Sequence, residues 1–351
     1  MKYKRHFLFI ALAVVFNIPV VQSAAGQNAR GGNASAKVLI PHESWNCGMA
    51  DGIPAPESGS LTFEIAMKFE KVLDVGKTPF GDRKVIVAQE GTLSGPKLMG
   101  TVMPGALDFE LKLSNGTIEV EQIFVLKTDD GKYVYVRNAG TGADSNDVRV
   151  VMNFEAPNAA PSAWLNSGKY VSRREVNVAA KTLTIRVYDV SSVSLPTGSA
   201  NVTRINKPAG TPNQSWDYRK PAPSEKQGDV LITETVTLSP SQSVGMSKRG
   251  NRNIIPITGG ELSGRVPGKV LFGGADYQNL SGPPAIDARY LWQASNGDII
   301  IVRNTGSGTL IPTFEVRVDS PYAFLNKGLY RSSPPGIKPG GVGITMYDSI
   351  P

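Results

Sequence analysis

Three charged residues in the last third of the chain could form a binding or catalytic site. Asp276 follows two glycines at the expected end of a strand, where small residues would let a ligand approach the backbone. Asp287 and Arg289 are two positions apart on the next expected strand, so their side chains point to the same face. An Asp–Arg pair can orient a ligand carboxylate or carbonyl group. Two aromatic neighbours, Tyr277 and Tyr290, could pack against such a ligand.

The alternating pattern of this second strand is compatible with two orientations. In one, Asp287 and Arg289 face solvent, and the opposite face with Tyr290 and Trp292 forms the core. In the other, the charged pair faces the barrel interior or an interface and can engage a ligand. Asp276 is either a turn residue that accepts hydrogen bonds from backbone amides or a carboxylate at the mouth of a barrel.

The rest of the sequence excludes most common catalytic centres. Outside the first 25 residues there is one histidine, His42, and the chain has one cysteine, Cys47. A His-rich zinc site is therefore excluded, and no CxxC, HExxH, GxSxG, GxGxxG or Walker A motif occurs. We expect no metal and no cofactor. Catalysis, if present, would depend on carboxylate, Arg and Tyr side chains, and the catalytic residues are unknown.

The elements that must position these residues occur twice. VRNAG at 136–140 matches VRNTG at 302–306, and GTLSG at 91–95 matches GELSG at 260–264. Asp108 corresponds to Asp276 in this alignment. A repeat of this length indicates that the chain is a tandem duplication of one domain.

Each copy has the pattern of short antiparallel strands. Apolar residues alternate with polar ones from Leu61 to Glu70, and Gly-containing turns separate the following strands. No long amphipathic helix is present, so the fold class is all-β. A closed up-and-down barrel of the calycin or lipocalin type is favoured over a sandwich, because tight hairpins join the strands and glycines fall at strand ends.

This pattern divides the chain into five segments. We expect a signal peptide at 1–25, an irregular lead-in at 26–57 and a first barrel at 58–190. A Pro- and Ser-rich linker at 191–228 then leads to a second barrel at 229–349.

The second copy resembles a family known as domain of unknown function 3237. The matching motifs are GGADY at 273–277, IDARY at 286–290 and a turn at Gly297, where Asn296 replaces the usual acidic residue. The resemblance implies a compact β-barrel and no established reaction.

The first copy is a degenerate version of the same pattern. Glu121 stands where the second copy has Asp287, and Ile123 stands where it has Arg289. If the charged pair were only scaffold, the first copy would need it too. We therefore expect any site to lie in the second barrel, near Asp276, with the first barrel as a supporting domain.

The N-terminus predicts export. A basic start, an apolar run from Phe7 to Val21 and small residues near Ser23 are typical of a cleaved secretory signal peptide. Without the three basic residues of this segment, the formal charge of +7 falls to 7 − 3 = +4, too little to indicate nucleic acid as a partner. We expect a secreted or periplasmic protein that has no membrane association after cleavage.

Several properties stay open at this point. Five Asn-x-Ser/Thr sequons matter only if the host glycosylates, so a bacterial periplasmic and a fungal secreted protein are both compatible. Cys47 is a buried apolar residue, a reactive thiol or a partner in an interchain disulfide. The oligomeric state cannot be read from the sequence.

Three functions agree with these features. The favoured one is binding of a small aromatic or carboxylated organic molecule in the second barrel. The second is a cofactor-independent lyase, isomerase or hydrolase that uses Asp276 or Asp287 as acid–base and Arg289 as anion stabiliser. The third is a structural or interaction module without a ligand.

Overall fold

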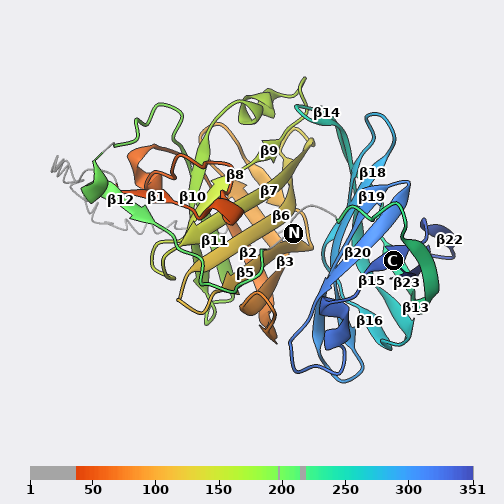
Figure 1. The fold of residues 1–351 in the computed structure, drawn as a ribbon. Helices are drawn as coiled ribbons and strands as arrows, with labels where there is room; N and C mark the ends of the chain where they lie inside the picture. Colours follow the sequence, from red (N-terminus) through yellow and green to blue (C-terminus); the bar gives the residue numbers. More distant parts are fainter. Residues whose placement is uncertain (1–36, 197, 214–218, 351) are drawn as a thin grey trace, which may run out of the picture. The chain divides into compact units, whose positions relative to one another are not determined.

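The computed structural model describes residues 37–196, 198–213 and 219–350. Residues Ser35–Pro351 form one compact unit, which holds two antiparallel β-barrels of eight strands each (Figure 1). The tandem all-β barrel architecture predicted from the repeat is thereby confirmed. The predicted signal peptide at 1–25 lies outside the described residues. No helix in the described part of the chain is long and apolar enough to cross a membrane.

The first barrel is a closed ring of hydrogen-bonded neighbours. Its ring order is β3-β2-β11-β10-β8-β7-β6-β5, and β5 pairs with β3 to close it. The strands are β2 (Ser60–Lys77), β3 (Asp82–Ser94), β4 (Gly100–Val102), β5 (Ala106–Lys112), β6 (Ile118–Thr128), β7 (Tyr133–Gly142), β8 (Arg149–Met152), β9 (Phe154–Glu155), β10 (Tyr170–Asn177) and β11 (Thr182–Asp189).

The second barrel repeats this ring with one interrupted strand. Its ring order is β13-β15-β17-β18-β19-β20-β21-β23, and β23 pairs with β13 to close it. The strands are β13 (Lys226–Leu238), β14 (Gln242–Ser247), β15 (Gly250–Gly264), β16 (Gly268–Val270), β17 (Ala275–Asn279), β18 (Ala285–Ala294), β19 (Ile299–Ser307), β20 (Thr309–Glu315), β21 (Tyr330–Ser332), β22 (Gly336–Lys338) and β23 (Gly341–Ile350).

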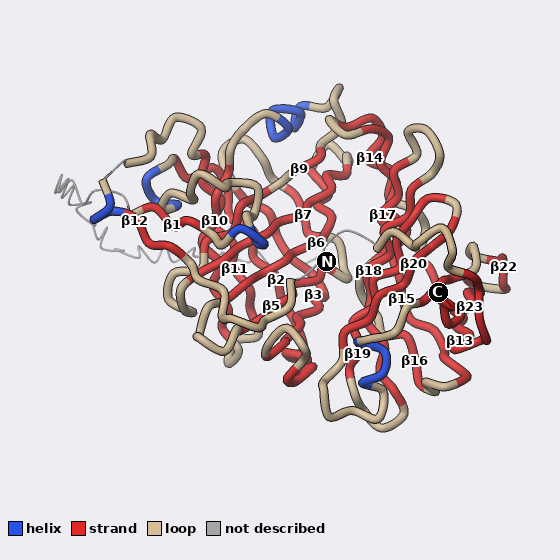
Figure 2. Tube along the Cα trace, viewed as in Figure 1, coloured by secondary structure: helices blue, strands red, loops and turns tan. Residues whose placement is uncertain are grey.

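Alternation along the strands sorts the side chains into an inner and an outer set. In β2 the residues Phe63, Ile65 and Met67 point inward and belong to the core of the first barrel. In β18 the residues Tyr290 and Trp292 do the same for the second barrel. Figure 2 shows that strands make up nearly all of both barrels. Each interior is therefore a packed core of its own.

The outer faces of the two barrels share a third apolar cluster. Val85, Phe109 and Tyr135 of the first barrel pack in it with Tyr277 and Leu291 of the second. The Tyr135 and Tyr277 ring centroids are 5.3 Å apart. Burial of these side chains holds the two barrels together.

Two ion pairs flank this cluster and mirror each other. Arg83 Nε donates to Glu315 Oε1 at 2.8 Å, and Arg252 Nε donates to Glu155 Oε2 at 2.7 Å. The repeat alignment makes Arg83 equivalent to Arg252 and Glu155 equivalent to Glu315. The barrels thus meet through equivalent surfaces related by a pseudo-two-fold axis, as in an isologous dimer.

The lead-in and the segment between the barrels pack on the first barrel. β1 (Val38–Ile40) pairs in parallel with β12 (Val202–Arg204), which lies inside the predicted linker. Short 3-10 helices accompany these segments: η1 (Glu43–Trp45), η2 (Pro56–Ser58) and η4 (Ser199–Asn201), with η3 (Pro161–Asn166) and η5 (Ala323–Asn326) in the barrels. The indole of Trp45 donates to the carbonyl of Gly140 at 2.8 Å.

Candidate functional site

Three neighbouring strands of the second barrel place a polar row on its inner face. Asp276 in β17 is opposite Ala288 in β18, and Ala288 is opposite Asn304 in β19. Ala275 and Tyr277 belong to the outer cluster, so the pleat directs Asp276 inward. Ala288 belongs to the inner core of the barrel. Asp276 and Asn304 therefore face the interior on either side of a small side chain.

The equivalent row of the first barrel is a continuous hydrogen-bond network. Gln122 Nε2 donates to Asp108 Oδ2 at 2.7 Å, and Asn138 Nδ2 donates to Gln122 Oε1 at 3.0 Å. Arg174 from β10 adds a bidentate pair to Asp108, with distances of 2.6 and 2.9 Å. The backbone amide of Asn153 donates to Asn138 Oδ1 at 3.0 Å. Every member of this row is thus satisfied within the protein.

The second barrel keeps both ends of this network and lacks both connecting side chains. Ala288 stands where the first barrel has Gln122, and Pro334 stands where it has Arg174. Asp276 accepts one hydrogen bond, from Gln278 Nε2 at 2.8 Å, and Asn304 donates one to Ser332 Oγ at 3.0 Å.

At each end of the polar row in the second barrel, one side-chain oxygen lacks a hydrogen-bond donor among the described residues. Asp276 Oδ1 and Asn304 Oδ1 are both buried and have no hydrogen-bond partner among the described residues. A buried acceptor without a donor costs about 1–3 kcal/mol. Both acceptors lie on one interior face, where the other copy satisfies the equivalent groups within the protein.

The electrostatic environment of Asp276 differs from that of Asp108. Burial raises the pKa of Asp276 to about 6, the hydrogen bond from Gln278 opposes this shift, and the Asp287 charge adds to it. No arginine contributes, in contrast to the Arg174–Asp108 pair. Asp276 is therefore a carboxyl group that changes charge close to neutral pH.

A second carboxyl group lies in the same interior. Glu234 accepts hydrogen bonds from Tyr290 Oη at 2.6 Å and Trp292 Nε1 at 2.9 Å. Burial raises the pKa of Glu234 to about 7, although both hydrogen bonds oppose the shift. Sequence reasoning missed this residue. Its signal is a Glu at an inward position of an apolar strand, where the first copy has Ile65.

One end of the second barrel is more accessible than its counterpart. The inward side chains Leu238, Ile255 and Ile286 are partly exposed. Their equivalents in the first barrel are all buried, namely Phe69, Ile86 and Val120. The first barrel also leaves no space for a water-sized molecule next to Asp108 and Gln122. The polar row of the second barrel therefore lies next to interior residues that are partly exposed.

The five residues named from the sequence do not form one site. Asp276 and Tyr290 lie inside the second barrel, whereas Tyr277, Asp287 and Arg289 lie on its outer face against the first barrel. The expectation that Asp287 and Arg289 form a site with Asp276 is corrected. Asp276 is opposite Ala288 and shares its face, so Asp287 and Arg289, on either side of Ala288, point to the other face of the sheet.

Arg289 is held in an ion-pair cluster between the barrels. Its Nε donates to Asp287 Oδ1 at 2.6 Å, and its Nη1 lies 3.3 Å from Glu121 Oε1. Arg137 Nε donates to the same Glu121 oxygen at 3.3 Å, and Arg137 Nη1 lies 3.7 Å from Asp287. Burial disfavours the charge of Asp287, but Arg289 and Arg137 together lower its pKa. The pair is therefore satisfied by the interface itself.

The described residues contain no group of three or more His, Cys, Asp and Glu side chains that could hold a metal ion.

A family model that matches both copies of the repeat establishes the family of the chain. The family model of DUF3237, a protein family of unknown function, matches residues 58–193 and 228–318, more than half of the chain. The chain therefore belongs to the DUF3237 family and carries two copies of its domain.

Curated relatives agree with this assignment. The chain is 36% identical over 78 residues to a UPF0311 protein of Rhodopseudomonas palustris, and 40% identical over 78 residues to one of Bradyrhizobium diazoefficiens. These matches cover 22% of the chain and 51% of each relative, so the chain spans about half the length of the curated relatives it matches.

Two crystal structures match single-barrel lengths of the chain. One is a conserved protein of unknown function from Rhodopseudomonas palustris, with 26% identity, a TM-score of 0.32, and coverage of 37% of this chain and 95% of that protein. The other is a β-barrel-like protein from Acinetobacter baumannii, with 20% identity, a TM-score of 0.33, and coverage of 37% and 94%.

Proposed function

We propose that the second barrel binds a small organic molecule that donates hydrogen bonds to Asp276 and Asn304. The observation that carries this proposal is the pair of unpartnered oxygens, Asp276 Oδ1 and Asn304 Oδ1, on either side of Ala288. A ligand hydroxyl, phenol or amine group fits there, because both acceptors lack a donor.

The surrounding side chains favour an aromatic ligand over a carboxylated one. Tyr290, Trp292 and Phe314 line the same interior, with ring centroids of successive pairs 6.4 and 5.1 Å apart. A ligand carboxylate would meet Asp276 without a compensating cation, at a cost from like-charge repulsion. Of the two ligand classes predicted from the sequence, aromatic ligands are retained and carboxylated ones are disfavoured at this site.

The experiment is a ligand-observed NMR screen with small hydroxylated aromatic fragments. Wild-type protein should bind a subset of them, and Asp276→Ala should weaken these fragments about tenfold, as expected for one charge-assisted hydrogen bond. Toluene-like controls without the hydroxyl should be unaffected by this substitution. Fragments that bind the Asp276→Ala variant as tightly as the wild-type protein would contradict the proposed site.

Proton-transfer catalysis at the same position is the second candidate. The pKa of Asp276, raised to about 6 by burial, suits a general base near neutral pH, and Asp276 lies beside partly exposed interior residues. Exchange of an acidic C–H proton of a bound ligand with deuterated solvent tests this candidate. An exchange rate that increases with pH around a pKa near 6, and that is lost in Asp276→Asn, would support catalysis. Ligand binding without exchange would exclude this candidate and support a binding protein.

Export of this protein is proposed on the N-terminal sequence alone. The basic start, apolar run and small residues at Ser23 and Ala25 support cleavage near that point. N-terminal sequencing of secreted or periplasmic material should begin near Ala24 or Gly26. A product that retains Met1 would contradict the proposal.

A further inference from the structure

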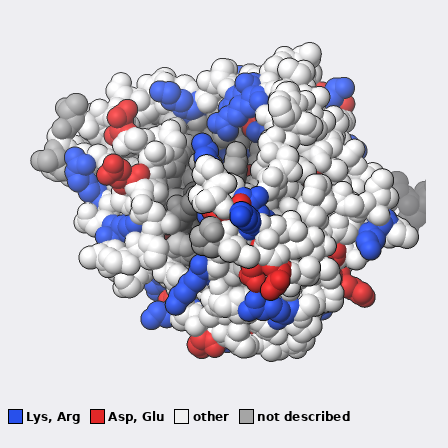
Figure 3. Space-filling view, turned by 45° about the vertical axis from the view of Figure 1, so that its right-hand side comes forward, with Lys and Arg blue, Asp and Glu red and all other residues white. Residues whose placement is uncertain are grey.

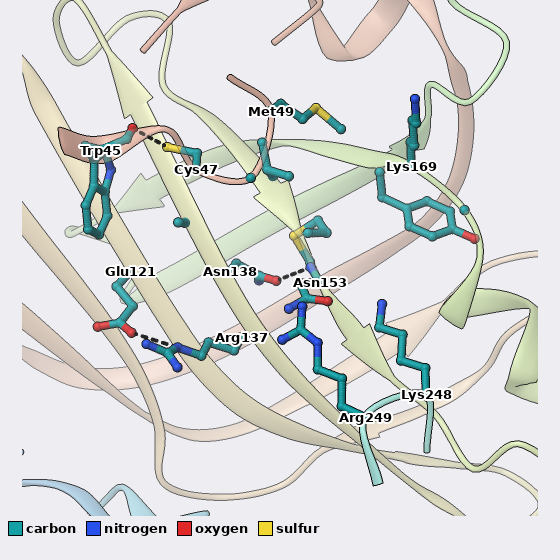
Figure 4. Close-up of a pocket in the computed structure, with 16 residues that line it drawn as sticks. Trp45, Cys47, Met49, Glu121, Arg137, Asn138, Asn153, Lys169, Lys248 and Arg249 are labelled. Carbon is teal, nitrogen blue, oxygen red and sulfur yellow. Dashed lines mark hydrogen bonds and ion pairs between the residues drawn. The ribbon is translucent and has the colours of Figure 1, made fainter. Parts of the chain in front are cut away.

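A cavity on the outer side of the first barrel has a different chemistry from the interior site. Its volume is about 440 Å³, within the range of small-molecule sites. The lead-in loop around Cys47 and Met49 borders it on one side, and strands β7 and β8 form its floor. Lys248 and Arg249, from the turn between β14 and β15, complete the wall (Figure 4).

The charged groups of this cavity are mostly cationic. Arg137, Lys169, Lys248 and Arg249 line it, with Glu121 as the single carboxylate. Figure 4 shows Lys248 and Arg249 near the amide side chain of Asn153, whereas Arg137 points toward Glu121 and Lys169 lies farther off. The face drawn in Figure 3 shows Lys and Arg side chains beside a hollow near its middle.

The carboxylates near these cations are already shared. Glu121 is contacted by both Arg137 and Arg289. Arg249 lies 3.9 Å from Glu155, but Glu155 is held at 2.7 Å by Arg252. Arg137 is paired with Glu121 and Asp287, so the excess positive charge of the cavity comes from Lys169, Lys248 and Arg249.

Lys248 is one of the cations that contribute to the excess positive charge of the cavity. Its ammonium group lies 3.4 Å from the carbonyl oxygen of Asn166 and makes no ion pair with a described residue. Partial burial and the neighbouring charge of Arg249 lower the pKa of Lys248, and the charge of Glu155 opposes this shift. Two neighbouring cations that share Glu155 with Arg252 favour the approach of an anion.

The barrel scaffold does not require these cations. At the equivalent positions of the other copy, Pro79 replaces Lys248 and Phe80 replaces Arg249. Leu329 stands where the first barrel has Lys169. Both turns join equivalent strands of the two barrels, so the fold does not require these basic residues.

We propose that this cavity is a second binding site, which takes a small organic anion bearing a phosphate or carboxylate group. Lys248 and Arg249 anchor the anion, and the side chain of Asn153 provides a hydrogen bond. The site is independent of the Asp276 site, because it lies on the outer face and uses cations instead of a carboxylate.

Calorimetric titration of the full-length mature protein with inorganic phosphate and with citrate tests this proposal. We expect binding of at least one anion, and a loss of at least about tenfold in affinity in a Lys248→Gln/Arg249→Gln variant, since each charge-assisted contact contributes a factor of this order. Tighter phosphate binding identifies a phosphorylated ligand, and tighter citrate binding identifies a polycarboxylate.

A matched variant separates a site from general attraction. Lys327→Gln/Lys338→Gln removes the same charge from exposed positions outside the cavity, and its affinity should equal that of the wild type. Equal losses in both double variants, or no binding of either anion to the wild type, would overturn the proposal. Thermal unfolding of each variant checks that the exposed substitutions leave the fold intact.

Discussion

The two barrels of this chain share one fold, but the polar row on the inner face is connected by hydrogen bonds in the first barrel and interrupted in the second. In the first barrel, Arg174 and Gln122 connect Asp108 to its neighbours and close the network. In the second, Pro334 and Ala288 occupy those positions, and Asp276 retains an oxygen without a partner. The first barrel thus has a complete hydrogen-bond network in its interior. The second barrel keeps the residues at both ends of this network but lacks the side chains that connect them.

The largest effect should come from breaking the closed network of the first barrel. Arg174→Met leaves Asp108 and Glu110 without their buried arginine, so the free energy of unfolding should fall by about 5 kcal/mol. Denaturant unfolding measures this loss. A change below about 1 kcal/mol would show that the ion pair does not hold the first interior together.

A smaller loss is expected at the interface between the barrels. Arg289→Ile copies the first repeat and removes the partner of Asp287 and Glu121, but Arg137 stays beside both carboxylates. We expect a decrease of about 3 kcal/mol in the free energy of unfolding and unchanged fragment binding at Asp276. Lost binding with unchanged stability would instead restore Arg289 as a ligand residue.

The pH dependence of stability should differ between the two interiors. A carboxyl group whose folded pKa is raised stabilises the fold below the unfolded pKa, and this contribution is lost as pH rises through the folded value. For Glu234, with a pKa of about 7, the loss between about pH 4.5 and 7 should be roughly 2–3 kcal/mol.

Glu234→Gln isolates this effect. The difference in unfolding free energy between variant and wild type should move in favour of the variant as pH rises from about 4.5 to 7. Ile65, which occupies the equivalent position of the first barrel, has no charge to titrate. A difference that stays constant across this range would show that Glu234 does not titrate there.

The smallest change in stability is expected from restoring the missing connection. Ala288→Gln places in the second barrel the amide that links Asp108 and Asn138 in the first. The new contacts should offset most of the packing strain, leaving a net change of about 1 kcal/mol. Fragment binding should nevertheless be abolished, because the amide occupies the position of the ligand. Gln122→Ala in the first barrel is the reverse control.

Much of the fold could be predicted from the sequence, because repeats and period-two alternation are local signals. Matching motifs such as GTLSG and GELSG located both barrels, and alternation separated Asp287 and Arg289 from Tyr290 and Trp292. Alternation does not tell what covers the outer face. The burial of Arg289 depends on contacts with Glu121, 168 positions away in the chain.

The candidate site in the second barrel could be predicted only in part, because it also depends on contacts between strands that are distant in the sequence. Asp276 could be identified from the repeat, but its state depends on which side chains on neighbouring strands satisfy it. Recognising that Ala288 and Pro334 remove those partners requires the register of the strands, which places Asp276, Ala288 and Asn304 in one row. Glu234 was overlooked because a single charged residue in an apolar strand does not change the strand prediction.

We propose that the second barrel binds a ligand between Asp276 and Asn304. A high-resolution crystal structure of the wild-type protein soaked with its best hydroxylated aromatic fragment tests this most directly. Density between the two side chains, with a ligand donor within about 3 Å of Asp276 Oδ1, is the predicted result. Fragment density confined to the outer surface, with only packed side chains in that gap, would contradict the claim.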